Sequence, residues 1–115
     1  MHRFSHHAVG VQQGDALLFS AFEDGGEMWT GKGPRLVRYP VAFDGAFLTP
    51  PLVHVSIAMW DIGGGTNQRA DISAEDVTET GFTILFRSWD DTRVARIRAA
   101  WLAIGPVRHD DDWEL

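Results

Sequence analysis

The sequence predicts an all-β fold, a six-stranded antiparallel β-sandwich. Three observations lead to this prediction. Apolar and polar residues alternate over short stretches, most clearly in residues 52–61 and 81–89. Glycine and proline interrupt the chain often, as expected for short strands joined by turns. No stretch shows the sustained period of an amphipathic helix, so the chain is expected to lack long helices.

The six strands are expected, in order, at residues 10–22, 36–43, 52–61, 68–77, 81–89 and 94–105. In the first strand, Gly14-Asp15 would allow a bend. A glycine-rich polar loop, residues 23–34, separates the first two strands. In the third strand, Val53, Val55, Ile57 and Met59 are expected to share one face. Three consecutive glycines at 63–65 then predict a flexible turn.

At 115 residues, the chain is long enough for one domain with a hydrophobic core. We expect residues 10–105 to form the sandwich domain. Residues 1–9 are then an N-terminal extension, and residues 106–115 are an acidic C-terminal tail that is loosely ordered.

Composition excludes several classes of function. The formal net charge of −6 argues against a nucleic-acid partner, which would favour a basic surface. The absence of a long apolar run argues against membrane insertion. Because the chain has no cysteine, it has no disulfides, thiolate metal sites or cysteine nucleophiles. The first residues lack the apolar stretch of a secretory signal, so synthesis in the cytoplasm is expected, with particle-associated or non-classical release left open.

The sequence does not predict an enzyme. Carboxylates occur as neighbours at Glu75-Asp76, Asp90-Asp91 and Asp110–Asp112. Adjacent residues of a strand point to opposite faces, so such pairs do not supply the two facing carboxylates that glycosidases need. The histidines His2, His6, His7 and His109 match no metal-binding spacing, and neither a metal nor another cofactor is expected.

A binding site is better supported than a catalytic one. Sugars present hydroxyls and one apolar face, so their sites combine an aromatic ring, a planar donor and a carboxylate acceptor. Trp89 and Asp90 supply the ring and the acceptor at the end of the fifth strand. If the fourth and fifth strands form a hairpin centred near Glu79, Arg69 lies beside Trp89 at its open end. Equally, Trp89 could be a core or subunit-interface residue, and Arg69 a partner in a surface salt bridge.

At these residues the chain resembles the H-type lectin family, which includes N-acetylgalactosamine-binding agglutinins and the C-terminal domain of discoidins. Each matched segment is short, but their order and spacing are specific and they span nearly the whole chain. The segments are Val11–Gly14, Val41–Phe43, Pro50–Ile57, Trp60-Asp61, Arg69, Val77–Phe82, Trp89–Thr92 and Trp101–Ile104.

The resemblance implies a six-stranded sandwich that assembles as a trimer, with sugar sites between neighbouring protomers. Arg69 matches the family's arginine, and Trp89-Asp90 stands where the family has a Trp-His pair. Lys32 occupies the position of an aspartate from the adjacent protomer, and Ala95 that of a tyrosine. These three differences depart from the pattern for N-acetylgalactosamine. One hypothesis is that Lys32 of a neighbour pairs with Asp90, exchanging the charges across the interface.

The leading interpretation is therefore a non-enzymatic lectin module that binds cell-surface or capsular glycans of N-acetylgalactosamine or galactose type. Its sites are expected at the protomer interfaces of a homotrimer or hexamer. Several sites on one rigid body would gain avidity on a surface with repeated glycans. The alternative is a structural trimerisation module, for example of an adhesion spike or fibre, that binds no sugar.

Expectations also follow for three further aromatic positions. Asp61, beside Trp60, is expected to accept hydrogen bonds from backbone groups near the glycine turn. Trp101 is expected in the core or along the trimer axis. Trp29, in the polar loop, would either extend a binding surface or cap one end of the sandwich.

Overall fold

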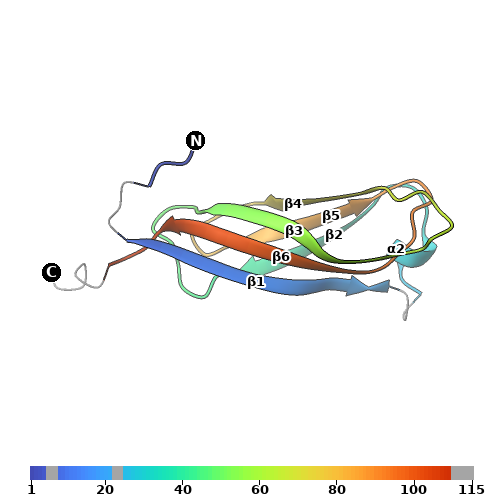
Figure 1. Cartoon of the computed structure of the whole chain (residues 1–115), viewed down its shortest axis with the longest axis horizontal. Coiled ribbons are helices and arrows are strands. Elements are labelled where there is room, and N and C mark those ends of the chain that lie inside the picture. The colour runs from blue at the N-terminus through green and yellow to red at the C-terminus, as the bar shows by residue number, and fades with distance from the viewer. Residues whose placement is uncertain (5–7, 22–24, 110–115) are drawn as a thin grey trace.

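The computed structural model describes residues 1–4, 8–21 and 25–109, and these form two three-stranded antiparallel sheets (Figure 1). One sheet has the strand order β1-β6-β3 and the other β2-β5-β4. This confirms the predicted six-stranded sandwich. The elements are β1 (Val9–Ser20), α2 (Glu27–Thr30), β2 (Arg35–Ala42), β3 (Leu52–Ile62), β4 (Ala70–Glu75), β5 (Gly81–Ser88) and β6 (Val94–Pro106).

Most strand boundaries lie within two residues of those predicted. The fourth strand is the shortest, because Asp76 adopts a left-handed φ of 53° and ends the extended backbone there. β1 carries its irregularity between Leu17 and Phe19, whereas Gly14 pairs regularly with Trp101. The first strand begins at Val9 and the last ends at Pro106, each one residue beyond the expected bounds of the sandwich domain. Most of the predicted tail lies outside the described residues.

The core lies between the two sheets. β5 and β6 are the central strands, and most of their inward side chains are fully buried, with Trp101 partly buried. On β3, the predicted alternation holds for Val53, Val55 and Ile57, which pack against this core. A register shift after Ile57 places Met59 opposite the exposed Arg98, so the prediction for Met59 is wrong. A bulge adds one residue to a strand, which reverses the alternation beyond it.

The polar loop 23–34 contains a feature that the sequence did not indicate, the four-residue helix α2. So short a helix leaves no periodic pattern to detect. Its Met28 is buried in the core, and its Trp29 packs against the same core from the edge. The guanidinium of Arg93 lies 4.3 Å from the centre of the Trp29 ring. Trp29 therefore caps one end of the sandwich, one of the two roles expected for it.

Asp61 differs from its expected role. Its carboxylate accepts hydrogen bonds from Arg96, at 3.0 Å from Nε and 2.9 Å from a terminal nitrogen. Asp61 and Arg96 are cross-strand partners on β3 and β6, so their side chains emerge on the same face of the sheet. The carboxylate is thus held by a side chain rather than by backbone donors of the glycine turn. Among the described residues, no helix is both long and apolar enough to cross a membrane.

Candidate functional site

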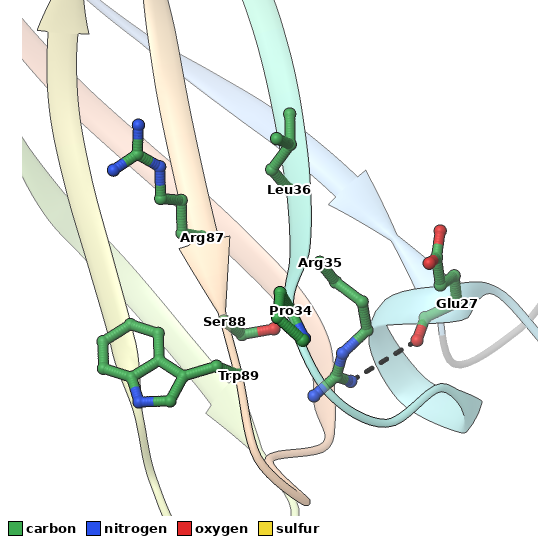
Figure 2. Close-up of a pocket in the computed structure, with 7 residues that line it drawn as sticks. All are labelled: Glu27, Pro34, Arg35, Leu36, Arg87, Ser88 and Trp89. Atoms are coloured by element: carbon green, nitrogen blue, oxygen red, sulfur yellow. Dashed lines mark hydrogen bonds between the residues drawn. The ribbon is translucent and has the colours of Figure 1, made fainter.

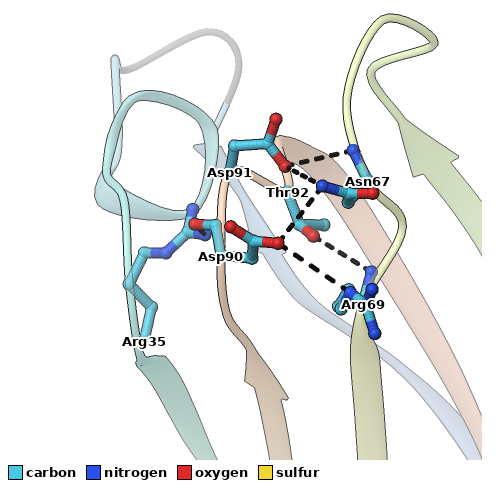
Figure 3. Close-up of polar contacts among 6 residues, drawn as sticks. All are labelled: Arg35, Asn67, Arg69, Asp90, Asp91 and Thr92. Atoms are coloured by element: carbon cyan, nitrogen blue, oxygen red, sulfur yellow. Dashed lines mark hydrogen bonds and ion pairs between the residues drawn. The ribbon is translucent and has the colours of Figure 1, made fainter.

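The turn between β5 and β6 and the loop before β4 meet at one end of the sandwich, where a set of hydrogen bonds joins them (Figure 3). The side-chain amide of Asn67 donates to Asp90 Oδ2 and to Asp91 Oδ1, each at 3.1 Å. The backbone N–H of Asn67 donates to the same Asp91 oxygen at 3.1 Å. The backbone N–H of Arg69 donates to Thr92 Oγ1 at 3.0 Å. The two segments are therefore fixed relative to each other.

The strand register brings Arg69 and Trp89 together. β4 and β5 pair with Ala70 opposite Ser88, so Arg69 and Trp89 are the next positions along the two strands. The hairpin closes at the other end through the Thr78 N–H, which donates to the Gly81 carbonyl at 2.9 Å. The predicted hairpin, with Arg69 beside Trp89 at its open end, is confirmed.

The three side chains of this cluster are accessible. Trp89 is 40% exposed, so it is not a core residue of the protomer. Arg69 and Asp90 are about half exposed, and the Arg69 Nε lies 3.9 Å from Asp90 Oδ2. That separation is an ion pair but exceeds the length of a hydrogen bond, so the guanidinium keeps donors for a ligand. Asp90 has a left-handed φ of 63°, which sets the tight turn that carries its carboxylate.

Arg35 holds the turn from the opposite side. It is only 4% exposed, and its guanidinium donates to backbone carbonyls rather than to a carboxylate. Nε donates to Gly33 at 2.9 Å, and the two terminal nitrogens donate to Met28 at 3.3 Å and to Asp90 at 3.2 Å. The Gly33 N–H also donates to the Asp90 carbonyl at 2.9 Å. The loop that carries α2 and the turn that carries Asp90 therefore form one unit.

Lys32 lies on this loop but on a different side of the turn. It is exposed and lines a cavity of about 430 Å³, together with Trp29, Asp91 and Arg93. The Asp90 carboxylate has Asn67 and Arg69 of its own chain as partners. The structure thus brings together Arg69, Trp89 and Asp90, while a contact between Lys32 and the Asp90 of a neighbouring protomer stays a prediction.

Sequence reasoning missed two residues of this site, Asn67 and Arg35. The one signal that could have marked Asn67 is its place in the sequence, after the glycine turn and two positions before Arg69. Arg35 is a charged residue at the first position of an alternating strand, where an exposed side chain would be expected. Within residues 1–4, 8–21 and 25–109, no group of three or more His, Cys, Asp or Glu could hold a metal ion.

This arrangement suits a polar ligand with an apolar face. Trp89 offers a ring surface, Asp90 accepts hydrogen bonds, and Arg69 donates them. Because Asn67 and Arg35 hold the turn in place, a ligand would not have to order it on binding.

Several known proteins are similar to this chain. A curated relative described as "ATP synthase subunits region ORF 7", from Fuscovulum blasticum, is 56% identical over 108 residues and 94% of each chain. One of the discoidin-1 polypeptides of Dictyostelium discoideum is 35% identical over 75 residues, which are 64% of this chain and 30% of the discoidin. The chain therefore spans about a third of the discoidin.

The fold matches solved structures of discoidin II from Dictyostelium discoideum. The recombinant native structure superposes with a TM-score of 0.74 at 22% identity, over 91% of this chain and 40% of the discoidin. A second discoidin II structure gives the same TM-score. The model of the H-type lectin domain matches residues 38–104, which are more than half of the chain. The chain therefore belongs to the H-type lectin domain family, related to the C-terminal domain of discoidins.

Proposed function

We propose that this domain is a non-enzymatic carbohydrate-binding module whose site is the cluster of Trp89, Asp90 and Arg69. The observation that carries the proposal is the exposed Trp89 ring beside a positioned acid and guanidinium. Membership of a lectin family supports it, because that family is typically non-enzymatic and binds carbohydrate. The proposed ligands are cell-surface or capsular glycans of N-acetylgalactosamine or galactose type.

The proposed active form is a homotrimer or a hexamer with its sites between protomers. A single shallow polar site exchanges water for ligand with little net gain, so several sites acting together are needed for strong binding. In this arrangement Lys32 of one protomer lies against the Asp90 of its neighbour and completes the site. The exposed position of Lys32 is compatible with such a contact.

The outer face of the β1-β6-β3 sheet supports self-association. Val11, Ile104 and Leu52 are directly opposite one another across its three strands. Val11 is 61% exposed, and Leu52 and Val9 are also largely exposed. Contiguous exposed apolar side chains of this kind are typical of a surface that another protein covers. We propose that this face is buried between the protomers of the trimer.

The same face also favours the second candidate function, a trimerisation module without sugar binding. The two functions differ in whether Arg69 and Trp89 are needed for glycan binding. In the assembly role, substitution of either residue leaves the protein unaffected, because neither belongs to the apolar face.

The test is a screen of the purified protein on a glycan array, after its mass in solution has been measured. Arg69→Ala and Trp89→Ala are the test variants. Arg38→Ala and Leu48→Ala are controls, since Arg38 is also an exposed arginine in a surface ion pair and Leu48 is an exposed apolar side chain in the connector between β2 and β3. We expect glycan binding that both test variants lose and both controls keep. A well-folded trimer that binds no glycan would reject the lectin function and favour the assembly role.

A further inference from the structure

A groove of about 470 Å³ adjoins Trp89 where β2 begins and β5 ends (Figure 2). Its volume is within the usual range of small-molecule sites. Residues of three segments line it, namely the helix α2, the start of β2 and the end of β5. They are Glu27, Pro34, Arg35, Leu36, Arg87, Ser88 and Trp89.

Not all of the polar groups in the groove are available. The guanidinium of Arg35 is used by backbone carbonyls, and Ser88 Oγ donates to the sulfur of Met28 at 3.7 Å. Two charged side chains remain at the rim, the exposed Glu27 and Arg87. Within the part of the chain that the structure describes, Arg87 has a long ion pair of 3.7 Å with Glu75. A hydroxyl-bearing ligand would therefore find one acceptor and one donor.

The groove also has apolar surface. Leu36 is 50% exposed and lines the groove. Leu36 and Arg87 are cross-strand partners, so both emerge on the outer face of the β2-β5-β4 sheet. Pro34 continues this surface toward α2. The combination of an apolar surface with an acceptor and a donor at its rim matches one face and the hydroxyls of a pyranose ring.

The groove lies next to the proposed binding cluster. Arg69 directly precedes β4, Trp89 directly follows β5, and Leu36 is in β2. Leu36 is opposite Arg87, two residues along β5 from Trp89, whereas Arg69 is level with Trp89. Two strand spacings and two residues along the strand therefore separate Arg69 and Leu36 by roughly 12 Å, diagonally across the sheet. That separation suits two linked sugar rings on either side of the indole.

We propose that the groove is a second sugar subsite, so that the domain binds an oligosaccharide of at least two residues across Trp89. This inference rests on the proposed carbohydrate-binding function. The first residue lies against Arg69 and Asp90. The adjoining residue lies on Leu36, accepts a hydrogen bond from Arg87 and donates one to Glu27.

The test compares ligands of increasing length by titration calorimetry with the full chain. The probes are the methyl glycosides of N-acetylgalactosamine and of galactose, and glycans of two to four residues that carry each sugar at the terminus. For the wild type we expect an affinity about tenfold higher for the extended glycans than for the monosaccharide, equivalent to about 1.4 kcal/mol.

Two groove variants, Leu36→Ser and Arg87→Ala, should bring the affinity ratio between extended glycan and monosaccharide close to one, with the monosaccharide affinity unchanged. Arg38→Ala is the matched control for Arg87, because both arginines pair with Glu75 but Arg38 lies outside the groove. Leu48→Ser is the control for Leu36, since Leu48 is an equally exposed leucine in a distant connector. Both controls should keep the wild-type ratio.

Three outcomes would overturn the inference. Equal affinities of the wild type for monosaccharide and extended glycans would reject the second subsite and leave the proposed function intact. A tenfold preference that both groove variants keep would place the added contacts elsewhere on the protein. Absence of binding to every probe by a correctly assembled protein would reject the proposed function for these sugars, and with it the second subsite.

Discussion

Two tryptophans at opposite ends of the sandwich have contrasting surroundings. Trp101 packs against Phe43 and Phe82, with ring centroids 5.9 and 5.5 Å away, and its indole covers Gly14. Trp89 is 40% exposed and is surrounded by charged and polar side chains from two loops. The indole of Trp101 contributes its contacts to folding, whereas Trp89 leaves 40% of its surface exposed. A large apolar side chain kept in water beside positioned polar groups indicates a binding role.

The largest expected effect is on Trp101. Trp101→Ala would remove the indole from the contacts with Phe43 and Phe82 and leave a cavity at that end of the core. We expect it to lower the free energy of unfolding by about 3 kcal/mol. Chemical denaturation followed by far-UV circular dichroism would measure this. A loss as small as that of a surface substitution would remove the contrast between the two tryptophans.

Arg35→Ala should have the next largest effect, because it leaves several backbone carbonyls at the α2 end without their donor. We expect a loss of about 2 kcal/mol in stability and a weaker affinity for glycan, since the turn of Asp90 loses its support. Arg35→Lys should rescue little, because an ammonium group cannot reach carbonyls in these diverging directions. Full rescue by lysine of both stability and affinity would show that Arg35 acts through its charge alone.

Gly14→Ala tests the packing around Trp101 by adding a methyl group rather than by removing a side chain. A Cβ at this position would lie 2.9 Å from the indole of Trp101, which is too close for an ordinary contact. We expect a loss of about 1 kcal/mol, with the glycan affinity unchanged. The control is Gly64→Ala in the glycine turn, where a Cβ would meet open space. Equal melting temperatures of the two variants would show that Trp101 is free to move.

The sequence predicted the fold because its signals were repeated along each strand. Alternation in β3, β5 and β6 identified the strands, and the symmetric spacing of Arg69 and Trp89 about Glu79 predicted their register. Local features that depend on a single contact were not predictable. The helix α2 is too short to have a period, and the bulge at Met59 has no marker in the sequence.

The site was predicted in part for the same reason. The exposed members Trp89, Asp90 and Arg69 could be found by residue type and position along the hairpin. Asn67 and Arg35 act through loops that meet only in three dimensions, and Arg35 is buried although its residue type is usually exposed. The pairing of Asp61 with Arg96 was missed because it joins strands far apart in the sequence.

Asn67→Ala should have a smaller effect on stability than the substitutions above. Its hydrogen bonds to Asp90 and Asp91 are exposed to water, so we expect a loss below about 1 kcal/mol. The affinity for glycan should fall several-fold, because Asp90 loses a positioning donor. Thermal unfolding and calorimetry of the same preparation would separate the two effects. Unchanged affinity would show that Arg69 alone positions the Asp90 carboxylate.

The most direct test of the central claim is to measure glycan affinity and unfolding free energy together for Trp89→Ala, with Trp101→Ala beside it. We predict that Trp89→Ala lowers the affinity at least about tenfold and lowers the stability by less than half as much as Trp101→Ala does. Trp101→Ala should show the converse at temperatures where it stays folded. If Trp89→Ala bound glycan as tightly as the wild type, or lost as much stability as Trp101→Ala, the proposed binding role of Trp89 would be contradicted.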